Sequence, residues 1–257
     1  MISFTLAGHE FMSISAGPYF KPTPAISFVV NFDPAHMEDA EKKIDEVWAK
    51  LSEGGKIMMN LGEYPFSKRY GWCADKYGFS WQLILTDPEG EPRPTIIPSL
   101  LYVTPEGKMA EKATNFYLSV FKDSKRGRLV RYPSGMEPNR EGAIMFTDFM
   151  LEGQWFSAMD GDAAQHDFAF NEAVSFIVNC ETQEEIDHYW ERLSAVPEAE
   201  QCGWLKDEFG VSWQIVPTIM NEMMKKGGKE EVARMTQAFL KMKKFDIKAL
   251  VKAYEGK

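Results

Sequence analysis

Hydrophobic positions alternate in two segments of the chain, ISFVVNF at residues 26–32 and VSFIVNC at residues 174–180. A period of two predicts a β-strand with one buried face. After each strand the spacing becomes helical, and the first helix is predicted to begin after Asp33 and to end at Gly54. The second helix is predicted to begin after Thr182, which has the spacing of a capping box with Glu185.

Shorter apolar runs after each helix predict further strands. In the first copy they cover residues 56–61, 70–75 and 80–86, and in the second copy residues 200–206 and 211–217. A third copy has a strand at 100–103, a helix at 109–121 and strands near 129–132, 143–151 and 155–159. The repeating module is therefore a strand, a helix and three strands, which predicts an α+β fold.

An internal duplication relates these copies. GWCADKYGFSWQLI at residues 71–84 and GWLKDEFGVSWQIV at residues 203–216 share G, W, D, G, S, W and Q at the same spacing. A duplicated unit implies pseudo-twofold architecture. Residues 4–17 also match the end of the third copy, so the sequence is expected to start inside a module.

This matching predicts four parts of the chain. They are a first domain over 1–87 that lacks its first strand, helix and second strand, a Pro-rich linker over 88–98, a second domain over 99–217 and a helical tail over 218–257. A longer native chain that begins upstream of Met1 is the explanation we expect for the missing part. A partner chain that supplies the strands and a domain that tolerates the gap stay open, and open sheet edges invite pairing with another chain.

The net charge, the cysteines and the lack of long apolar runs restrict the partners and the cellular compartment that we expect. With 38 acidic and 29 basic side chains the net charge is −9, which repels a phosphate backbone, so we expect no nucleic-acid partner. The basic residues between 122 and 131 are interpreted as a solvated strand edge. Three cysteines without CxxC spacing and an N-terminus without a signal-peptide pattern predict a reducing cytoplasm. No apolar run approaches the roughly 20 residues that cross a bilayer, so no membrane partner is expected.

The repeated motifs resemble the vicinal oxygen chelate superfamily, which includes glyoxalase I, extradiol dioxygenases and bleomycin-resistance proteins. EYPFSKRYGWCADKYGFSWQL, RYPSGMEP and ISFVVNF are similar to its PhnB-like branch, much of which carries the label demethylubiquinone methyltransferase. The resemblance covers nearly everything up to Pro217. It implies two glyoxalase-like domains, each with curled mixed sheets that enclose a cup.

Alternation along the strands assigns side chains to the cup. The bulky Trp81, Leu83 and Leu85 are predicted to pack against the helices, which leaves the polar positions on the opposite face. The candidate ligand-binding residues on that face are Ser27, Asn31 and Gln82 in the first domain and Ser175, Asn179 and Gln214 in the second. Each of them also suits a structural role within the sheet.

Two further kinds of residue are candidates for ligand contact. Trp72 and Trp204 are placed to stack on a planar ligand, although tryptophan near a strand turn also suits the core. Residues 63–70 are extra in the first copy and are predicted to form either a lid, in which Lys68 or Arg69 meets an anion, or a plain surface loop. Asp75 and Asp207 recur after these tryptophans and are predicted to cap turns.

The residue types at the candidate site positions do not favour binding of a metal or a cofactor. Metal-dependent members of the superfamily place His, Glu or Gln ligands on the first and last strands of their modules. The corresponding strands here offer hydroxyl and amide groups, which are weak ligands for a transition metal. No glycine-rich loop joins a strand to a helix, so methyl transfer with a nucleotide-like cofactor is not supported either. We therefore predict neither a metal nor a cofactor and assign no catalytic residue.

Three functions remain as hypotheses. The first is a metal-independent protein that binds a small organic molecule in its cups. The second is a metal-dependent lyase, isomerase or dioxygenase of the glyoxalase type, and the third is a structural or interaction protein. A homodimer is expected in each case, because the first domain is incomplete and the fold commonly pairs modules across subunits.

Overall fold

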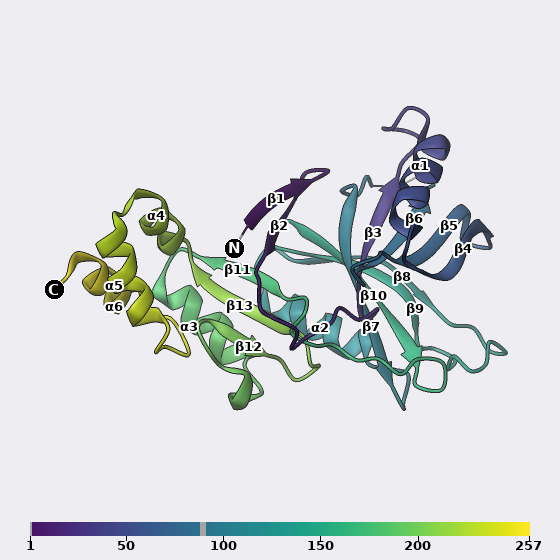
Figure 1. Cartoon of the computed structure of the whole chain (residues 1–257). Helices are drawn as coiled ribbons and strands as arrows, with labels where there is room; N and C mark the ends of the chain where they lie inside the picture. The colour runs from purple at the N-terminus through teal and green to yellow at the C-terminus, as the bar shows by residue number, and fades with distance from the viewer. Residues whose placement is uncertain (1, 88–90) are drawn as a thin grey trace. The chain divides into compact units, whose positions relative to one another are not determined.

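The computed structural model describes residues 2–87 and 91–257 and divides the chain into two compact units, residues 1–169 and 170–257 (Figure 1). These units do not coincide with the division at the linker that the sequence predicted. Residues 88–90 of that linker lie outside the described residues. Each unit is described by itself below.

One eight-stranded sheet forms the centre of the 1–169 unit, in the order β4-β5-β6-β3-β7-β10-β9-β8. One module supplies β3 (Ile26–Phe32), α1 (Ala40–Ser52), β4 (Lys56–Tyr64), β5 (Ser67–Ala74) and β6 (Ser80–Leu85). The next supplies β7 (Ile96–Thr104), α2 (Ala110–Val120), β8 (Lys125–Arg131), β9 (Ile144–Leu151) and β10 (Gln154–Asp162).

The two modules meet at the middle of this sheet. β3 and β7, the first strands of their modules, pair antiparallel, and each pairs in parallel with the last strand of its own module on its other side. The sheet therefore crosses the predicted linker and unites the 26–86 and 99–159 modules. Residues 91–95 form the link that leads directly into β7.

Both helices cover the same face of the sheet. A Cβ on Gly71 of β5 would lie 2.6 Å from Cζ3 of Trp48, so the glycine lets α1 approach closely. Gly71 is opposite Leu83, and Leu83 is opposite Val30. On the other half, Tyr117 of α2 stacks on Phe149 of β9, with ring centroids 6.5 Å apart. Leu83 and Phe149 are fully buried, which confirms that the bulky face packs on the helices.

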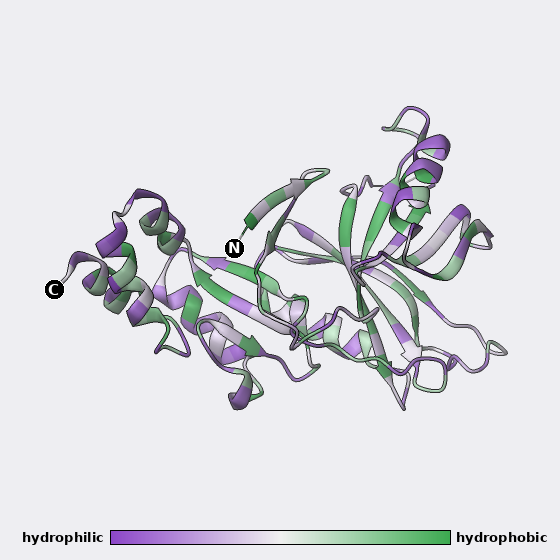
Figure 2. Cartoon of the chain, in the orientation of Figure 1, coloured by the Kyte–Doolittle hydropathy of each residue, from purple (hydrophilic) through white to green (hydrophobic). Residues whose placement is uncertain are grey.

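Hydrophobic residues are concentrated in the central strands of the large sheet. In Figure 2 the strands at the centre of the eight-stranded sheet are largely green and the exposed face of α1 is purple. All seven residues of β3 are buried. A strand that is buried on both faces loses the clean alternation of apolar and polar residues.

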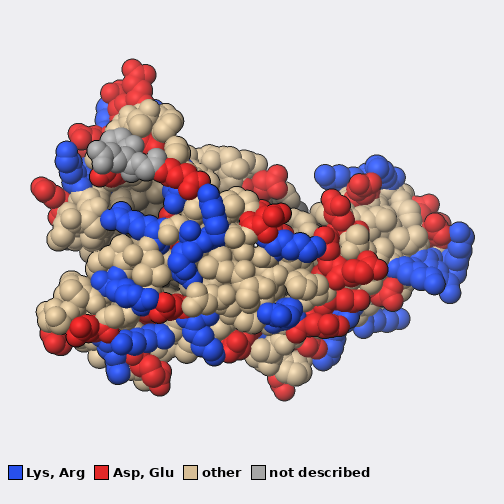
Figure 3. Space-filling view, turned by 180° about the vertical axis from the view of Figure 1, so that it is seen from behind, with Lys and Arg blue, Asp and Glu red and all other residues tan. Residues whose placement is uncertain are grey.

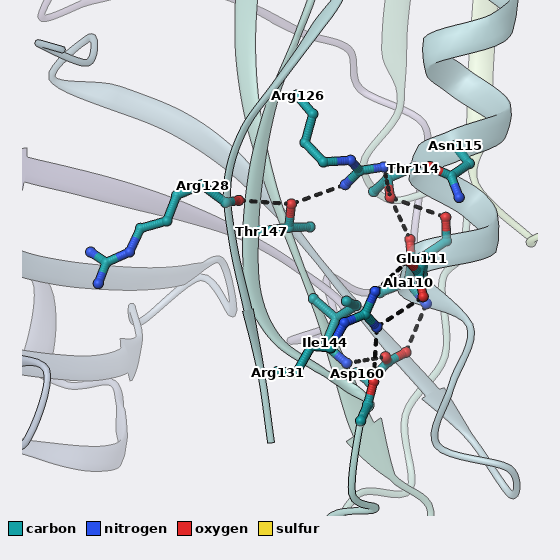
Figure 4. A network of polar contacts seen from close by, with 11 residues as sticks. Ala110, Glu111, Thr114, Asn115, Arg126, Arg128, Arg131, Ile144, Thr147 and Asp160 are labelled. Atoms are coloured by element: carbon teal, nitrogen blue, oxygen red, sulfur yellow. Dashed lines mark hydrogen bonds and ion pairs between the residues drawn. The ribbon is translucent and has the colours of Figure 1, made fainter. Parts of the chain in front are cut away.

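Arginines of β8 hold α2 against the sheet through hydrogen bonds and an ion pair (Figure 4). Arg126 donates to the hydroxyls of Thr114 and Thr147, both at 3.0 Å. Arg131 forms a bidentate pair with Glu111 at 2.6 and 2.9 Å, which lowers the pKa of the Glu111 carboxyl. These arginines lie on an exposed edge strand, as predicted, and the guanidinium groups of Arg126 and Arg131 also hold a helix in place.

A short hairpin precedes the large sheet. β1 (Ile2–Leu6) and β2 (His9–Ser13) pair antiparallel through a turn at Ala7 and Gly8. Phe11 of β2 meets Phe28 of β3 edge to face, with centroids 5.2 Å apart. Because Phe28 belongs to the helix-covered face, the hairpin packs on that side of β3.

The 170–257 unit contains a three-stranded sheet in the order β11-β13-β12. β11 (Phe176–Cys180) is followed by α3 (Gln183–Leu193), the short 3-10 helix η1 (Pro197–Ala199), β12 (Trp204–Lys206) and β13 (Ser212–Pro217). The hydroxyl of Thr182 accepts from Glu185 N at 3.2 Å, which confirms Thr182 as the helix cap, and the Glu185 carboxylate accepts from Glu181 N, one residue before the cap.

The helical tail that the sequence predicted is present. It consists of α4 (Thr218–Lys226), α5 (Lys229–Phe239) and α6 (Ile247–Glu255). The backbone N–H groups of Cys202 and Gly203 donate to the carbonyls of Met242 and Lys243, each at 2.8 Å. These bonds hold the segment between α5 and α6 against the turn that precedes β12.

Two local predictions need correction. The first helix begins at Ala40, because the carboxylate of Asp33 accepts from Ala35 N and forms a separate turn instead of the helix cap. Residues 63–70 are no loop, since β4 continues to Tyr64 and β5 begins at Ser67, so a tight hairpin joins them. Added residues in a hairpin lengthen two paired strands without a free loop.

The predicted fold class is confirmed as a mixed α+β structure with curled mixed sheets and a helical C-terminal region. Within the described residues, no helix has the length and apolar character needed to span a membrane. Figure 3 shows acidic and basic side chains interspersed on the face that it displays.

Candidate functional site

A row of hydroxyl side chains crosses the helix-free face of the eight-stranded sheet. Ser80 of β6 is opposite Ser27 of β3, Ser27 is opposite Ser99 of β7, and Ser99 is opposite Ser157 of β10. These four residues, called the serine row below, are each 1% exposed or less. They lie on the face away from the helices because their strand neighbours, such as Phe28 and Leu100, lie on the helix side.

At one end of the serine row, hydrogen bonds link Tyr70, Gln82 and Ser27 in series. Gln82 donates from Nε2 to Ser27 Oγ at 2.6 Å, and the Tyr70 hydroxyl donates to Gln82 Oε1 at 2.7 Å. Burial raises the pKa of Tyr70, so its hydroxyl stays protonated and remains a donor. The donor role of Tyr70 fixes the orientation of the Gln82 amide. Next along the row, Ser80 Oγ accepts from Trp72 Nε1 at 2.8 Å.

The other end of the row, formed by Ser99 and Ser157, is different. The hydroxyls of Ser99 and Ser157 are buried and have no hydrogen-bond partner among the residues that the structure describes. A buried polar group without a partner costs about 1–3 kcal/mol relative to one that is satisfied. Because the two serines face each other on neighbouring strands, they form one compact unsatisfied polar spot on the helix-free face.

Apolar side chains surround this spot. Val29, Ile97 and Trp155 form a buried cluster on the same face, and Ile84 and Met150 pack against it. Arg93, from the link before β7, lies over the Trp155 ring with its guanidinium carbon 3.6 Å from the ring centroid. Its Nε donates to Asp148 at 2.8 Å, so the charge of Arg93 is paired. The surroundings of Ser99 and Ser157 are therefore largely apolar, aromatic and neutral.

His166 approaches this face from the loop after β10. Its ring lies 6.4 Å from the Trp72 ring, edge to face, and a Cβ on Gly161 would lie 3.0 Å from its Cδ2. Burial lowers the pKa of His166, while the nearby Asp162 and Asp167 oppose that change. The neutral imidazole can donate or accept a hydrogen bond beside the serine row.

The other predicted site residues of this unit have partners within the fold. The Asn31 amide donates to the Pro94 carbonyl at 2.8 Å, which anchors the link before β7. Arg69 pairs with Asp45 of α1 and is therefore directed to the helix side. Lys68 is exposed on the hairpin of β4 and β5. The structure thus brings together Ser27, Gln82 and Trp72 and separates them from Arg69.

The second copy repeats part of this arrangement in the 170–257 unit. Gln214 Nε2 donates to Ser175 Oγ at 2.9 Å, as Gln82 does to Ser27. Trp204 and Gln214 are half-buried, and Asn179 is exposed. The counterpart of Tyr70 is Cys202, so this copy has no phenol to orient the glutamine. The two copies share the Gln–Ser pair and differ in how closely it is enclosed.

The recurring aspartates cap turns, as predicted. Asp75 accepts from the N–H groups of Tyr77 and Phe79 and from Trp81 Nε1. Asp207 does the same with Phe209, Val211 and Trp213. Both carboxylates are used by the fold, which explains why the motif repeats them.

Potential metal ligands are dispersed. In the part of the chain that the structure describes, no group of three or more His, Cys, Asp or Glu side chains is placed to hold an ion. The hydroxyl and amide donors of the helix-free face are weak ligands for transition metals.

Sequence reasoning missed Ser99, Ser157, Trp155 and Arg93. It paired the 26–86 module with residues 4–17, so residues of the third module were assigned to another cup. The alternation in SLLYV and WFSAM carried a signal, since Ser99 and Ser157 each stand at a small polar position among apolar neighbours. Which strands become neighbours, however, is not visible in that alternation.

The family model of 3-demethylubiquinone-9 3-methyltransferase matches residues 1–84 and 94–216. The chain belongs to this family. The matched ranges include the strands that carry the serine row. A search of curated proteins gives no match.

Three solved structures with detectable similarity are the following. A putative 3-demethylubiquinone-9 3-methyltransferase, PhnB protein, from Bacillus cereus is 34% identical, with a TM-score of 0.39, covering 46% of this chain and 96% of that chain. A glyoxalase I mutant from Zea mays is 16% identical, with a TM-score of 0.42, covering 78% of this chain and 70% of that one. The fosfomycin resistance protein FosX from Listeria monocytogenes is 16% identical, with a TM-score of 0.31, covering 52% and 97%.

Proposed function

We propose that this PhnB-like protein binds a small organic molecule on the helix-free face of the 1–169 unit without the help of a metal ion. The observation that carries the proposal is the unsatisfied pair of hydroxyls at Ser99 and Ser157. A ligand with a hydrogen-bonding group would satisfy both. The cost of burying them unpaired in the free protein then becomes binding energy in the complex.

The surroundings define the chemical class of the ligand. Val29, Ile97 and Trp155 favour an apolar and planar body, and the serine hydroxyls favour a polar acceptor such as a carbonyl oxygen. The charge of Arg93 is paired with Asp148, so a neutral ligand fits better than a strong anion. Trp72 and His166 are placed to meet the ligand at the other end of the row.

Methyl transfer, which the family's name denotes, is not part of this proposal. The sequence has no glycine-rich loop between a strand and a helix that would hold the cofactor of such a reaction. The residues of the helix-free face support recognition of a neutral molecule and supply no assigned nucleophile or acid–base pair.

Matched pairs of probes test the proposal. Acetophenone and acetylnaphthalene carry a carbonyl group, whereas ethylbenzene and ethylnaphthalene have similar shapes without it. We expect the carbonyl compounds to raise the melting temperature by a few degrees more than their hydrocarbon partners, because a ligand of the folded state stabilises it by mass action. Equal shifts within each pair, or no shift at all, would contradict the proposal.

The Ser99→Ala/Ser157→Ala variant gives a second prediction. In the absence of ligand we expect its free energy of unfolding to rise by about 1 kcal/mol for each removed hydroxyl, because alanine leaves no buried group unsatisfied. The preference for carbonyl probes should disappear in the same variant. Stability is measured by urea unfolding and probe binding by thermal shift.

Ser27→Ala is the matched control. Its hydroxyl lies in the same row but accepts from Gln82, so its removal leaves a buried amide donor unpaired. We expect this variant to lose about 1 kcal/mol of stability. If the double variant lost stability as well, Ser99 and Ser157 would have a structural role and the ligand proposal would fail.

A further inference from the structure

The hairpin of β4 and β5 holds a cluster of three aromatic rings. Tyr64 ends β4, Phe66 lies at the turn and Tyr70 lies in β5. The Tyr70 ring meets Phe66 and Tyr64 edge to face, with centroids 5.0 and 5.5 Å apart, and Tyr64 stacks on Phe66 at 5.7 Å. Phe66 is 59% exposed, whereas Tyr70 is 8% exposed. The two outer rings therefore cover Tyr70 and hold its phenol in place.

Tyr70 acts on the serine row through a single side chain, Gln82. The Tyr70 hydroxyl donates to Gln82 Oε1 at 2.7 Å, and Gln82 Nε2 donates to Ser27 Oγ at 2.6 Å. Gln82 is 5% exposed, so bulk water is not free to replace either partner. A phenol that donates selects the oxygen of the amide, and this directs the amide nitrogen toward Ser27.

The orientation of the Gln82 amide determines what Ser27 can offer to a ligand. A serine hydroxyl has one hydrogen and two lone pairs. Ser27 receives the amide hydrogen on a lone pair and keeps its own hydrogen, which is donated to none of the described residues. Ser27 lies opposite Ser99 in the sheet. Its hydrogen is therefore available beside the unsatisfied hydroxyls of Ser99 and Ser157.

A reversed Gln82 amide would have the opposite effect. Its oxygen would face Ser27 and accept the Ser27 hydrogen, so the row would lose one donor. Its nitrogen would face the phenol, and the hydrogen of the Tyr70 hydroxyl would be left without an acceptor in a buried position. Burying a donor without a partner is unfavourable, so Tyr70 disfavours the reversed orientation.

The second copy lacks this arrangement. The small sheet of the described residues ends at β12, so it has no strand equivalent to β4. Cys202 takes the place of Tyr70, and a thiol is a weak donor. Gln214 is half-buried, so water can bond to its amide oxygen. The aromatic cluster of the hairpin thus occurs together with the enclosed glutamine of the first copy.

We propose that Tyr70 is a positioning residue that makes the ligand site selective for hydrogen-bond acceptors, because it fixes the Gln82 amide and so reserves the Ser27 hydrogen for the ligand. This inference rests on the ligand site proposed for the 1–169 unit. The ligand class becomes a planar molecule whose polar group accepts hydrogen bonds and does not donate them, as in an aryl ketone. Tyr64 and Phe66 act only through Tyr70.

Three bicyclic probes of similar size test this selectivity. 1-Indanone accepts a hydrogen bond, indole donates one through its N–H, and indane does neither. By titration calorimetry we expect the unsubstituted chain to bind indanone about tenfold more tightly than indane, and indole no more tightly than indane. In Tyr70→Phe the amide is free to reverse, so the preference for indanone over indole is expected to fall about tenfold.

Two further variants separate this role from a general loss of structure. Tyr64→Phe is the matched control, because the Tyr64 hydroxyl donates to Asn60 O at an exposed position of the same hairpin. It should keep the preference of the unsubstituted chain. In Tyr70→Phe/Gln82→Leu no amide is present to take the Ser27 hydrogen, so the preference for indanone over indole should return. A purely structural role of Tyr70 would not give this rescue.

The outcomes distinguish this inference from the proposed function. If Tyr70→Phe kept the tenfold preference, or if the double variant did not restore it, the role of Tyr70 would be refuted and the ligand site would stand. If the unsubstituted chain bound indanone no more tightly than indane, the ligand site itself would be refuted, and the role of Tyr70 with it.

Discussion

Replacing Asp160 with alanine is expected to lower the free energy of unfolding of the 1–169 unit by about 4 kcal/mol. Asp160 is 3% exposed and lies on the helix-covered face of β10. One carboxylate oxygen accepts from Met109 N and Ala110 N, and the other accepts from Ile144 N, all at 2.7 Å. The substitution leaves three backbone N–H groups without their acceptor.

The size of this effect follows from the position of α2. Met109 at its N-terminus has no side-chain cap, so a carboxylate from another strand takes that role. The negative charge also lies at the positive end of the helix dipole. Burial raises the pKa of Asp160, while its three N–H donors act in the opposite direction. The loss is measured as a lower urea midpoint with an unchanged slope.

Asp162→Ala is the control for this prediction. Its carboxylate accepts from Ala164 N within an exposed turn. We expect a loss of less than about 1 kcal/mol, because water can replace an exposed acceptor. Equal losses in the two variants would show that Asp160 does not hold α2 to the sheet.

Gly203→Ala is expected to destabilise the 170–257 unit by about 3–4 kcal/mol. Gly203 has φ of +82°, where an L side chain adds roughly 1–2 kcal/mol of strain. A Cβ there would also overlap the Phe245 ring and lie 3.0 Å from the Ile215 carbonyl oxygen. Forcing these groups apart adds about 1–3 kcal/mol. Because Phe245 belongs to the helical tail, the tail should detach first.

Limited proteolysis and urea unfolding measure this result. The variant is expected to lose residues after about position 217 at protease concentrations that leave the unsubstituted chain intact, because an undocked helix exposes its backbone. Gly153→Ala is the matched control. Gly153 has φ of +83° in the turn between β9 and β10, and a Cβ there meets nothing within 4 Å.

The control separates backbone strain from the steric clash. Gly153→Ala should cost only the strain of roughly 1–2 kcal/mol and leave the tail resistant to protease. If Gly203→Ala cost no more than Gly153→Ala, the contact of the tail with the turn before β12 would not contribute to stability. The two glycines have nearly the same φ, and their surroundings differ.

Local sequence patterns determined much of this protein. The period of two in ISFVVNF and VSFIVNC, the helical spacing after each and the helix cap at Thr182 all became the predicted elements. The repeated W-x-x-D motif produced the same turn twice, with Asp75 and Asp207 in equivalent bonds. These features need only residues that are near in sequence or related by the duplication, so the amino-acid sequence contains them completely.

The tertiary structure alone decided which modules are joined. β3 and β7 pair through backbone N–H and C=O groups that every strand possesses. The pattern of side chains therefore did not predict that these two strands would pair. Because these strands meet, Ser99 and Ser157 come to lie beside Ser27 and Gln82, while β11 has β13 as its neighbour in the small sheet of the described residues. The sequence thus contained each module and its polar positions, and the pairing of strand edges determined where those positions form a site.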